Sequence, residues 1–117
     1  MQITALSQLL AVRALLTPSV WTQGATARDK RGVTTTVRTE DGNVNPRAVR
    51  FCLYGALMHT YAKADRCGHG PAYEIVGELL LKRGYSRSDT PVFNDEAGRT
   101  LEDIHALLDE AIAQLQG

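Results

Sequence analysis

The stretch Arg50-Phe51-Cys52-Leu53-Tyr54-Gly55-Ala56-Leu57-Met58 decides the fold of this chain. Wound as a helix, it is apolar on every side from Phe51 onward, and such a helix is usually covered by other elements in several directions. Asn45 and Pro46 precede it, and asparagine can cap the free amides of a helix whose first residue is proline. We therefore predict a long central helix over 45–65.

Apolar residues at three- and four-residue spacings predict further helices on both sides of this stretch. The first covers 3–16 and stops where Thr17-Pro18 breaks the pattern. Another covers 71–83, and Gly84 follows it in the position that favours a left-handed glycine. The last begins after Thr100, a typical N-cap, whereas 85–99 is polar and is expected to be a loop.

The segment between the first two helices is rich in glycine and β-branched residues. Its turn-like Asp29-Lys30-Arg31-Gly32 separates 22–28 from 33–39, which predicts a β-hairpin in the 22–39 region. The expected fold is therefore mainly α, with about four helices around a central apolar helix and a small hairpin between the first two. At 117 residues the chain suits a single domain over 1–117.

Small residues gather on one side of the predicted central helix. At 100° per residue, Ala48, Cys52, Gly55 and Ala62 share a face, where another backbone can come close. Cys52 has apolar neighbours on both sides, so we expect its thiol to stay protonated and to serve as packing.

Composition and charge are those of an ordinary globular protein. The chain is 44% hydrophobic, and 13 basic residues balance 13 acidic ones, so no global field draws it to nucleic acid or to an anionic membrane. Arg47 and Arg50 form a modest basic spot that we interpret as a solvated face. The apolar N-terminal run lacks preceding basic residues and is interrupted by Gln8 and Arg13, which does not fit a secretory signal. We expect a cytoplasmic protein with reduced cysteines and no membrane contact.

Metal and cofactor sites are not predicted. Cys67-Gly68-His69 offers two ligands in one loop, but structural zinc sites usually need a second close pair. We interpret Cys67 as an exposed thiol in a flexible loop and His105 as a partly covered surface histidine. No phosphate-binding glycine loop or Ser-His-Asp order is present, so no catalytic residue is assigned.

Two groups of polar and aromatic residues are the candidate binding site: Trp21, Gln23, Arg28, Asp29, Asn94, Asp95 and Arg99. If their two loops converge, they make a polar pocket with an aromatic floor from Trp21 or Phe93. The alternative, which we favour, is structural. Ion pairs of Arg28 with Asp95, or of Asp29 with Arg99, pin the loops, while Asn94 and Asp95 satisfy backbone donors in turns.

Several short motifs occur in a fixed order along the chain: Trp21-Thr22-Gln23-Gly24-Ala25, Ala27-Arg28-Asp29, Arg50-Phe51-Cys52-Leu53-Tyr54-Gly55-Ala56-Leu57, and Phe93-Asn94-Asp95-Glu96-Ala97-Gly98-Arg99-Thr100. In this combination the chain resembles a family of small bacterial and phage proteins of unknown function, over about residues 5–113. It departs from the family pattern at Phe93, where a tryptophan is typical, and in a longer 33–40 stretch. The resemblance implies the helical fold and assigns no activity.

Three functional hypotheses remain open. The leading one is a non-catalytic protein–protein interaction module, encoded by a phage or another mobile element, that covers a surface on an unidentified host or defence protein. The second is a small enzyme or ligand-binding protein that uses Arg28, Asn94, Asp95 and Arg99, with Cys52 as a further candidate. The third, a nucleic-acid-associated protein, is expected least because it needs a contiguous basic face.

Overall fold

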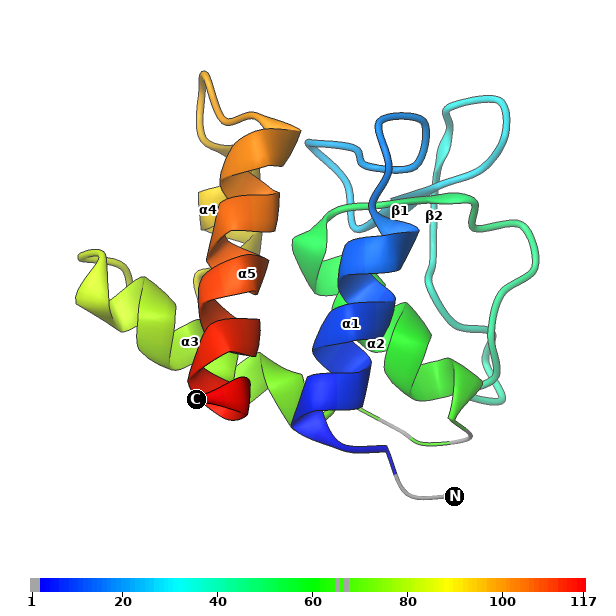
Figure 1. Ribbon diagram of the computed structural model, residues 1–117. Helices are drawn as coiled ribbons and strands as arrows, with labels where there is room; N and C mark the ends of the chain where they lie inside the picture. The colour runs from blue at the N-terminus through cyan, green and yellow to red at the C-terminus, as the bar shows by residue number, and fades with distance from the viewer. Residues whose placement is uncertain (1–2, 65, 67) are drawn as a thin grey trace.

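Five α-helices and three short strands follow one another in the computed structural model, which describes residues 3–64, 66 and 68–117. In chain order they are α1 (Ala5–Leu15), β1 (Ala27–Arg28), β2 (Thr34–Thr35), β3 (Arg50–Phe51), α2 (Leu53–Lys63), α3 (Ala72–Lys82), α4 (Thr90–Asp95) and α5 (Leu101–Gln116). The helices pack together, and the strands lie at one end of α1 and α2 (Figure 1). The predicted mainly α fold with a small β element is confirmed.

Helix α1 shares the centre of the fold with α2. Thr4 caps it, exchanging hydrogen bonds with Ser7 in a capping box, so the first turn has partners for its free amides. Figure 1 shows α1 (blue) between α2 (green) and α5 (red), and α1 also contacts α3. The interior it faces is a continuous cluster of buried apolar side chains contributed by all five helices.

Helix α2 begins later than the sequence predicts. Its N-cap is Cys52, and the preceding Arg50–Phe51 is strand β3, so the predicted start at Asn45-Pro46 is wrong. Asn45 does cap a backbone amide, but that of Arg47 in a tight turn, at 3.1 Å. Sheet pairing to β1, distant in sequence, overrides the local helix signal. At the other end Ala64 is the C-cap, and the predicted limit at Asp65 lies outside the described residues.

The β element is an antiparallel sheet of three strands in the order β2-β1-β3. Ala27 pairs with Thr35 on one side and with Phe51 on the other. The predicted hairpin is therefore present, but its strands are two residues long rather than seven, and a third strand completes the sheet. Phe51 and Ala27 are buried, which anchors this sheet to the helices.

The remaining helices follow the predicted signals, with one addition. Pro71 is the N-cap of α3 and Gly84 adopts a φ of 90° just beyond its end, as the sequence indicates. Thr100 caps α5 in a capping box with Asp103. The expected loop over 85–99 contains α4, a helix of six residues that is too short to show an apolar period. It packs on α2 and α3 and buries Phe93.

One member of the predicted small-residue strip brings two backbones together. A Cβ placed on Gly55 would lie 2.0 Å from the carbonyl oxygen of Thr26, so only glycine fits here. That carbonyl also accepts a hydrogen bond from the Cys52 amide, at 3.2 Å. Ala48 and Cys52 precede α2, so the strip does not run along one helix face as predicted. The close approach instead holds the 20–28 segment against the start of α2.

Gln8 is a buried polar pin between helices. Its side chain is fully buried and donates to the carbonyl oxygens of Leu57, at 3.0 Å, and His69, at 2.8 Å. Its Oε1 accepts the amide of Ala72, at 3.0 Å, which supplies the first turn of α3 with a partner.

No helix among the described residues is long and apolar enough to cross a membrane.

Candidate functional site

The two loops named by the sequence do converge, and Asn94 is where they meet. Its buried side chain accepts the indole Nε1–H of Trp21, at 2.7 Å, and the backbone amide of Leu53, at 3.0 Å. It donates to the carbonyl of Thr22, at 3.0 Å, and to the carboxylate of Asp95, at 2.9 Å. Asn94 on α4 thus clasps the 20–24 loop to the first turn of α2, and its amide has no polar atom left for a ligand.

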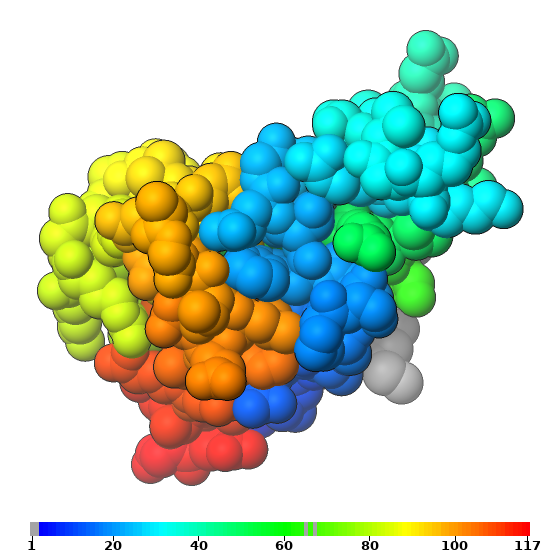
Figure 2. Space-filling view, turned by 90° about the horizontal axis from the view of Figure 1, so that it is seen from above, coloured from blue at the N-terminus to red at the C-terminus, as the bar shows by residue number. Residues whose placement is uncertain are grey.

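Gln23 and Asp95 reinforce this clasp from the two loops. The amide of Gln23 donates to the backbone carbonyl of Asn94, at 2.8 Å. The carboxylate of Asp95 accepts the amide of Gly24, at 3.0 Å. The space-filling view shows the same juxtaposition, with the segment near residue 20 (blue) against the segment near residue 100 (orange) (Figure 2).

Arg28 folds back on its own loop. Its guanidinium donates to the hydroxyl of Thr22 and the carbonyl of Gln23, both at 3.0 Å, and to the carbonyl of Gly32, at 3.1 Å. These three bonds use each of its nitrogens. Arg28 therefore joins the 22–24 loop to the hairpin turn and makes no ion pair with Asp95.

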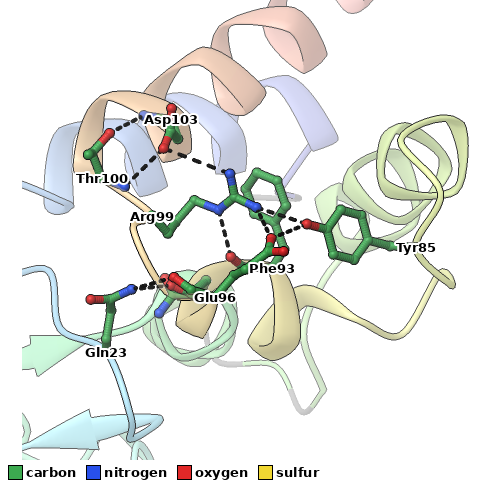
Figure 3. A network of polar contacts seen from close by, with 8 residues as sticks. Gln23, Tyr85, Phe93, Glu96, Arg99, Thr100 and Asp103 are labelled. Carbon is green, nitrogen blue, oxygen red and sulfur yellow. Dashed lines mark hydrogen bonds and ion pairs between the residues drawn. The ribbon is translucent and has the colours of Figure 1, made fainter.

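Arg99 is the second hub of the region (Figure 3). Its guanidinium lies 3.8 Å from the centre of the Phe93 ring, a cation–π geometry, and donates to the Phe93 carbonyl, at 2.8 Å. It also contacts the hydroxyl of Tyr85, at 2.9 Å, and the carboxylates of Glu96 and Asp103. Phe93 thus supplies the ring face on which the Arg99 guanidinium lies.

Asp29 lies apart from the other candidates. Its carboxylate accepts the amides of Arg31, at 2.8 Å, and Val33, at 3.0 Å, which closes the turn between β1 and β2. The Val33 amide, then the Arg31 amide and the charges of Arg31 and Arg47, lower the pKa of Asp29. The expected pair of Asp29 with Arg99 does not form, because each residue is bound within its own segment.

The thiol of Cys52 is sealed. Its side chain is 2% exposed, and its sulfur accepts the amide of Gly55, at 3.3 Å, as the N-cap of α2. Burial raises the pKa of this thiol above its ordinary value, so the group is protonated at neutral pH. The sequence placed Cys52 inside a helix; it lies at the helix start and, as expected, contributes to packing.

The candidate residues do not line one concavity. Trp21 lies in a depression of 460 Å³ with Leu101 and His105. Arg99 lies in one of 220 Å³ with Tyr85 and Phe93. Convergence of the loops therefore produces a bonded cluster and two separate surface depressions.

Two of the three histidines, His69 and His105, have partners within the chain. His69 stacks on Tyr73 with ring centres 3.8 Å apart, and His105 lies half-buried with Nε2 at 2.8 Å from the carbonyl oxygen of Leu16. Within residues 3–64, 66 and 68–117, no three His, Cys, Asp or Glu side chains gather in a way that could hold a metal ion. The predicted exposure of Cys67 falls outside the described residues.

A known family matches nearly the whole chain. A family model described as a family of unknown function, DUF6197, matches residues 1–114. The chain belongs to this family. No curated protein and no solved structure matches it. In this chain the Trp-Thr-Gln-Gly, Gly-Ala and Asn-Asp segments meet around Asn94 and Gly55.

A group of cations without ion pairs lies on the β element, and the sequence pattern indicated only its Arg47, as part of a basic spot with Arg50. Lys30 and Arg31 in the first turn, and Arg47 in the second, line a depression of 440 Å³ with Pro46 and Val49. None of these cations is in an ion pair among the described residues. A count would have indicated the feature: six basic residues stand in 28–50 (28, 30, 31, 38, 47, 50) against three acidic ones (29, 40, 41).

Proposed function

We propose that this DUF6197 protein is a non-catalytic protein–protein interaction module, acting in the cytoplasm by covering a surface of a partner protein. One observation carries the proposal: the polar motif side chains are bonded to the protein itself, whereas unpaired charged groups lie on the projecting β element. In the form suggested by the family resemblance, the chain is encoded by a phage or another mobile element and the partner is a host or defence protein.

The bonding of the motif residues supports a structural role for them. Asn94 makes four hydrogen bonds with its side chain and has no exposed surface. A catalytic or ligand-binding group needs at least one polar atom that is free to meet its substrate. Cys52, the strongest nucleophile type in the region, is buried and protonated, which weighs against covalent chemistry.

The shape of the molecule supports binding through the β element. The segment around residues 30–45 projects from the helical body when the molecule is seen from above (cyan in Figure 2). Val33, at 54% exposed, and Val49, at 42%, are among the most exposed large apolar side chains of the described residues. A projecting surface with apolar and charged groups suits contact with another protein better than enclosure of a small molecule.

Two parallel measurements test the proposal. In the first, the purified protein is screened by thermal denaturation against a library of metabolites and nucleotides. In the second, the protein is immobilised to capture other proteins, and each captured protein is purified and tested for binding by calorimetry. The proposal expects a purified protein that binds and raises the melting temperature, since a ligand at about 100 times its Kd stabilises by about 2.7 kcal/mol. A stabilising metabolite with no protein partner would overturn it.

A further inference from the structure

Three exposed cations gather at one place on the β element, away from the ion pairs of the described residues. All five ion pairs of the described residues join helical or helix-flanking segments, as with Arg13 and Asp109 or Arg83 and Glu110. Lys30, Arg31 and Arg47 are exposed and appear in none of them. A local gathering of exposed cations attracts negatively charged groups, so the place where they gather is a candidate contact surface.

These cations surround one depression, which we call the hairpin patch: Lys30, Arg31, Pro46, Arg47 and Val49. Asp29 is the one carboxylate that lines the hairpin patch, and it accepts the backbone amides of Arg31, at 2.8 Å, and Val33, at 3.0 Å. It anchors the turn that presents Lys30 and Arg31. The charge of Asp29 remains, and three cations stand against this one carboxylate, so the lining is cationic on balance and also contains the aliphatic Pro46 and Val49.

The hairpin patch is held in shape by backbone hydrogen bonds. The amide of Val49 donates to the carbonyl of Arg28, at 2.9 Å, and the amide of Gly32 to the carbonyl of Asp29, at 2.9 Å. The side chain of Asn45 bridges the second turn to the strand region, accepting the Arg47 amide and donating to the Thr36 carbonyl, at 2.7 Å. A surface that is ordered before binding loses less entropy on association.

We propose that the hairpin patch binds an acidic segment of a partner protein, with carboxylates at Lys30, Arg31 and Arg47 and an aliphatic side chain against Pro46 and Val49. This inference rests on the proposed function and adds the surface and the chemistry of the partner. Charge complementarity selects acidic groups, and the proline and valine between the cations favour a segment that also carries apolar side chains.

Two other occupants fit the patch less well. A phosphodiester backbone supplies charge but leaves Pro46 and Val49 without a partner, and the lining has no aromatic ring on which a base could stack. A second copy of this chain would need a free acidic face, and helix α5 carries four of the 13 acidic residues of the chain. Three of its four, Asp103, Asp109 and Glu110, already contact arginines within the chain.

The test uses a synthetic peptide of glutamate and leucine residues, with a matched peptide that has glutamine for every glutamate. Each is titrated into the ¹⁵N-labelled protein, and amide shifts give both the affinity and the place of binding. The Arg31→Glu/Arg47→Glu variant is compared with Lys63→Glu/Lys82→Glu, which changes the net charge equally at two exposed cations that also make no ion pair among the described residues. The Arg31→Gln/Arg47→Gln variant removes the two positive charges without adding negative ones. It therefore controls for a disturbance of the turn by the introduced glutamates.

We expect the acidic peptide to shift the amides of residues 29–33 and 46–50 and the glutamine peptide to shift none. The glutamate variant at positions 31 and 47 should lose about tenfold in affinity or more, the glutamine variant several-fold, and the Lys63/Lys82 control less than about threefold. Equal losses in the patch variant and the control, shifts centred on Trp21 and Asn94, or tighter binding of duplex DNA or RNA than of the peptide would each overturn the proposal.

The captured partner separates this inference from the proposed function. If that partner binds the Arg31→Glu/Arg47→Glu variant as tightly as the unchanged protein, the hairpin patch is not its docking site, although the chain remains an interaction module. If a purified partner binds and loses about tenfold or more in affinity with the patch variant alone, both proposals are supported.

Discussion

Replacing Asn94 by alanine tests whether the polar cluster around this residue serves the fold. Besides the exposed carboxylate of Asp95, the change leaves three groups without their partner: the indole N–H of Trp21, the amide of Leu53 and the carbonyl of Thr22. An unpaired buried polar group costs about 1–3 kcal/mol. Water can reach the half-buried Trp21 and Thr22 but not the buried Leu53, so we take the low end for the first two. The predicted loss is about 3–5 kcal/mol, a large part of the 5–15 kcal/mol typical of a domain.

Urea denaturation followed by circular dichroism measures this loss, provided that the m-value is unchanged. Asp95→Ala is the matched control, because Asp95 is exposed and its carboxylate bonds the amide of Gly24; we expect about 0.5–1.5 kcal/mol there. An Asn94→Ala protein within about 0.5 kcal/mol of the unchanged one would refute the clasp. If an Asn94→Ala protein of unchanged stability no longer bound the partner protein, the cluster would have to be regarded as a binding site.

Three further predictions concern other parts of the same region. Gly55→Ala should cost more than about 2 kcal/mol in thermal denaturation, because its Cβ would meet the Thr26 carbonyl at 2.0 Å; a variant as stable as the unchanged protein would disprove the close approach. Burial lowers the pKa of His59 below its ordinary 6.5, so its contribution to stability is complete above that pH and declines as the pH falls below it. Denaturant unfolding from about pH 7 to about pH 5 should show this decline and His59→Phe should flatten it, whereas equal slopes in the two proteins would count against it. In a Cys67→Ser background, a thiol reagent should label Cys52 only as fast as the protein opens, since the thiol is buried and its pKa raised; fast labelling of the folded protein would contradict this.

Helix ends with local chemical signals were predictable from the sequence. Pro71, Gly84 and Thr100 mark the limits of α3 and the start of α5, and each signal involves residues within one turn. Asn45-Pro46 carries an equally good local signal but does not start a helix. The pairing of Arg50–Phe51 with β1, more than twenty residues earlier, decides that segment, and no local pattern reports it.

The candidate site was predictable as a meeting of two loops but not in its bonding. Asn94 finds its partners in Leu53, Thr22 and Trp21, which are 41, 72 and 73 residues away. Residue types show that such bonds are possible, and only the packing of α4 on α2 shows which ones form. The ion pairs expected from charge alone, Arg28 with Asp95 and Asp29 with Arg99, do not form, because Arg28, Asp29 and Arg99 bind groups closer to them in the chain.

Asn94 holds the Trp21 loop against the start of α2 through hydrogen bonds to both. Native-state hydrogen exchange of the Trp21 indole N–H tests this without any substitution. The chain has a single tryptophan, so its indole gives one assignable signal. The account predicts that this proton, bonded to Asn94 at 2.7 Å, and the Leu53 amide exchange with protection close to the free energy of global unfolding. Exchange of the indole at the rate of a free tryptophan in the folded protein would contradict it.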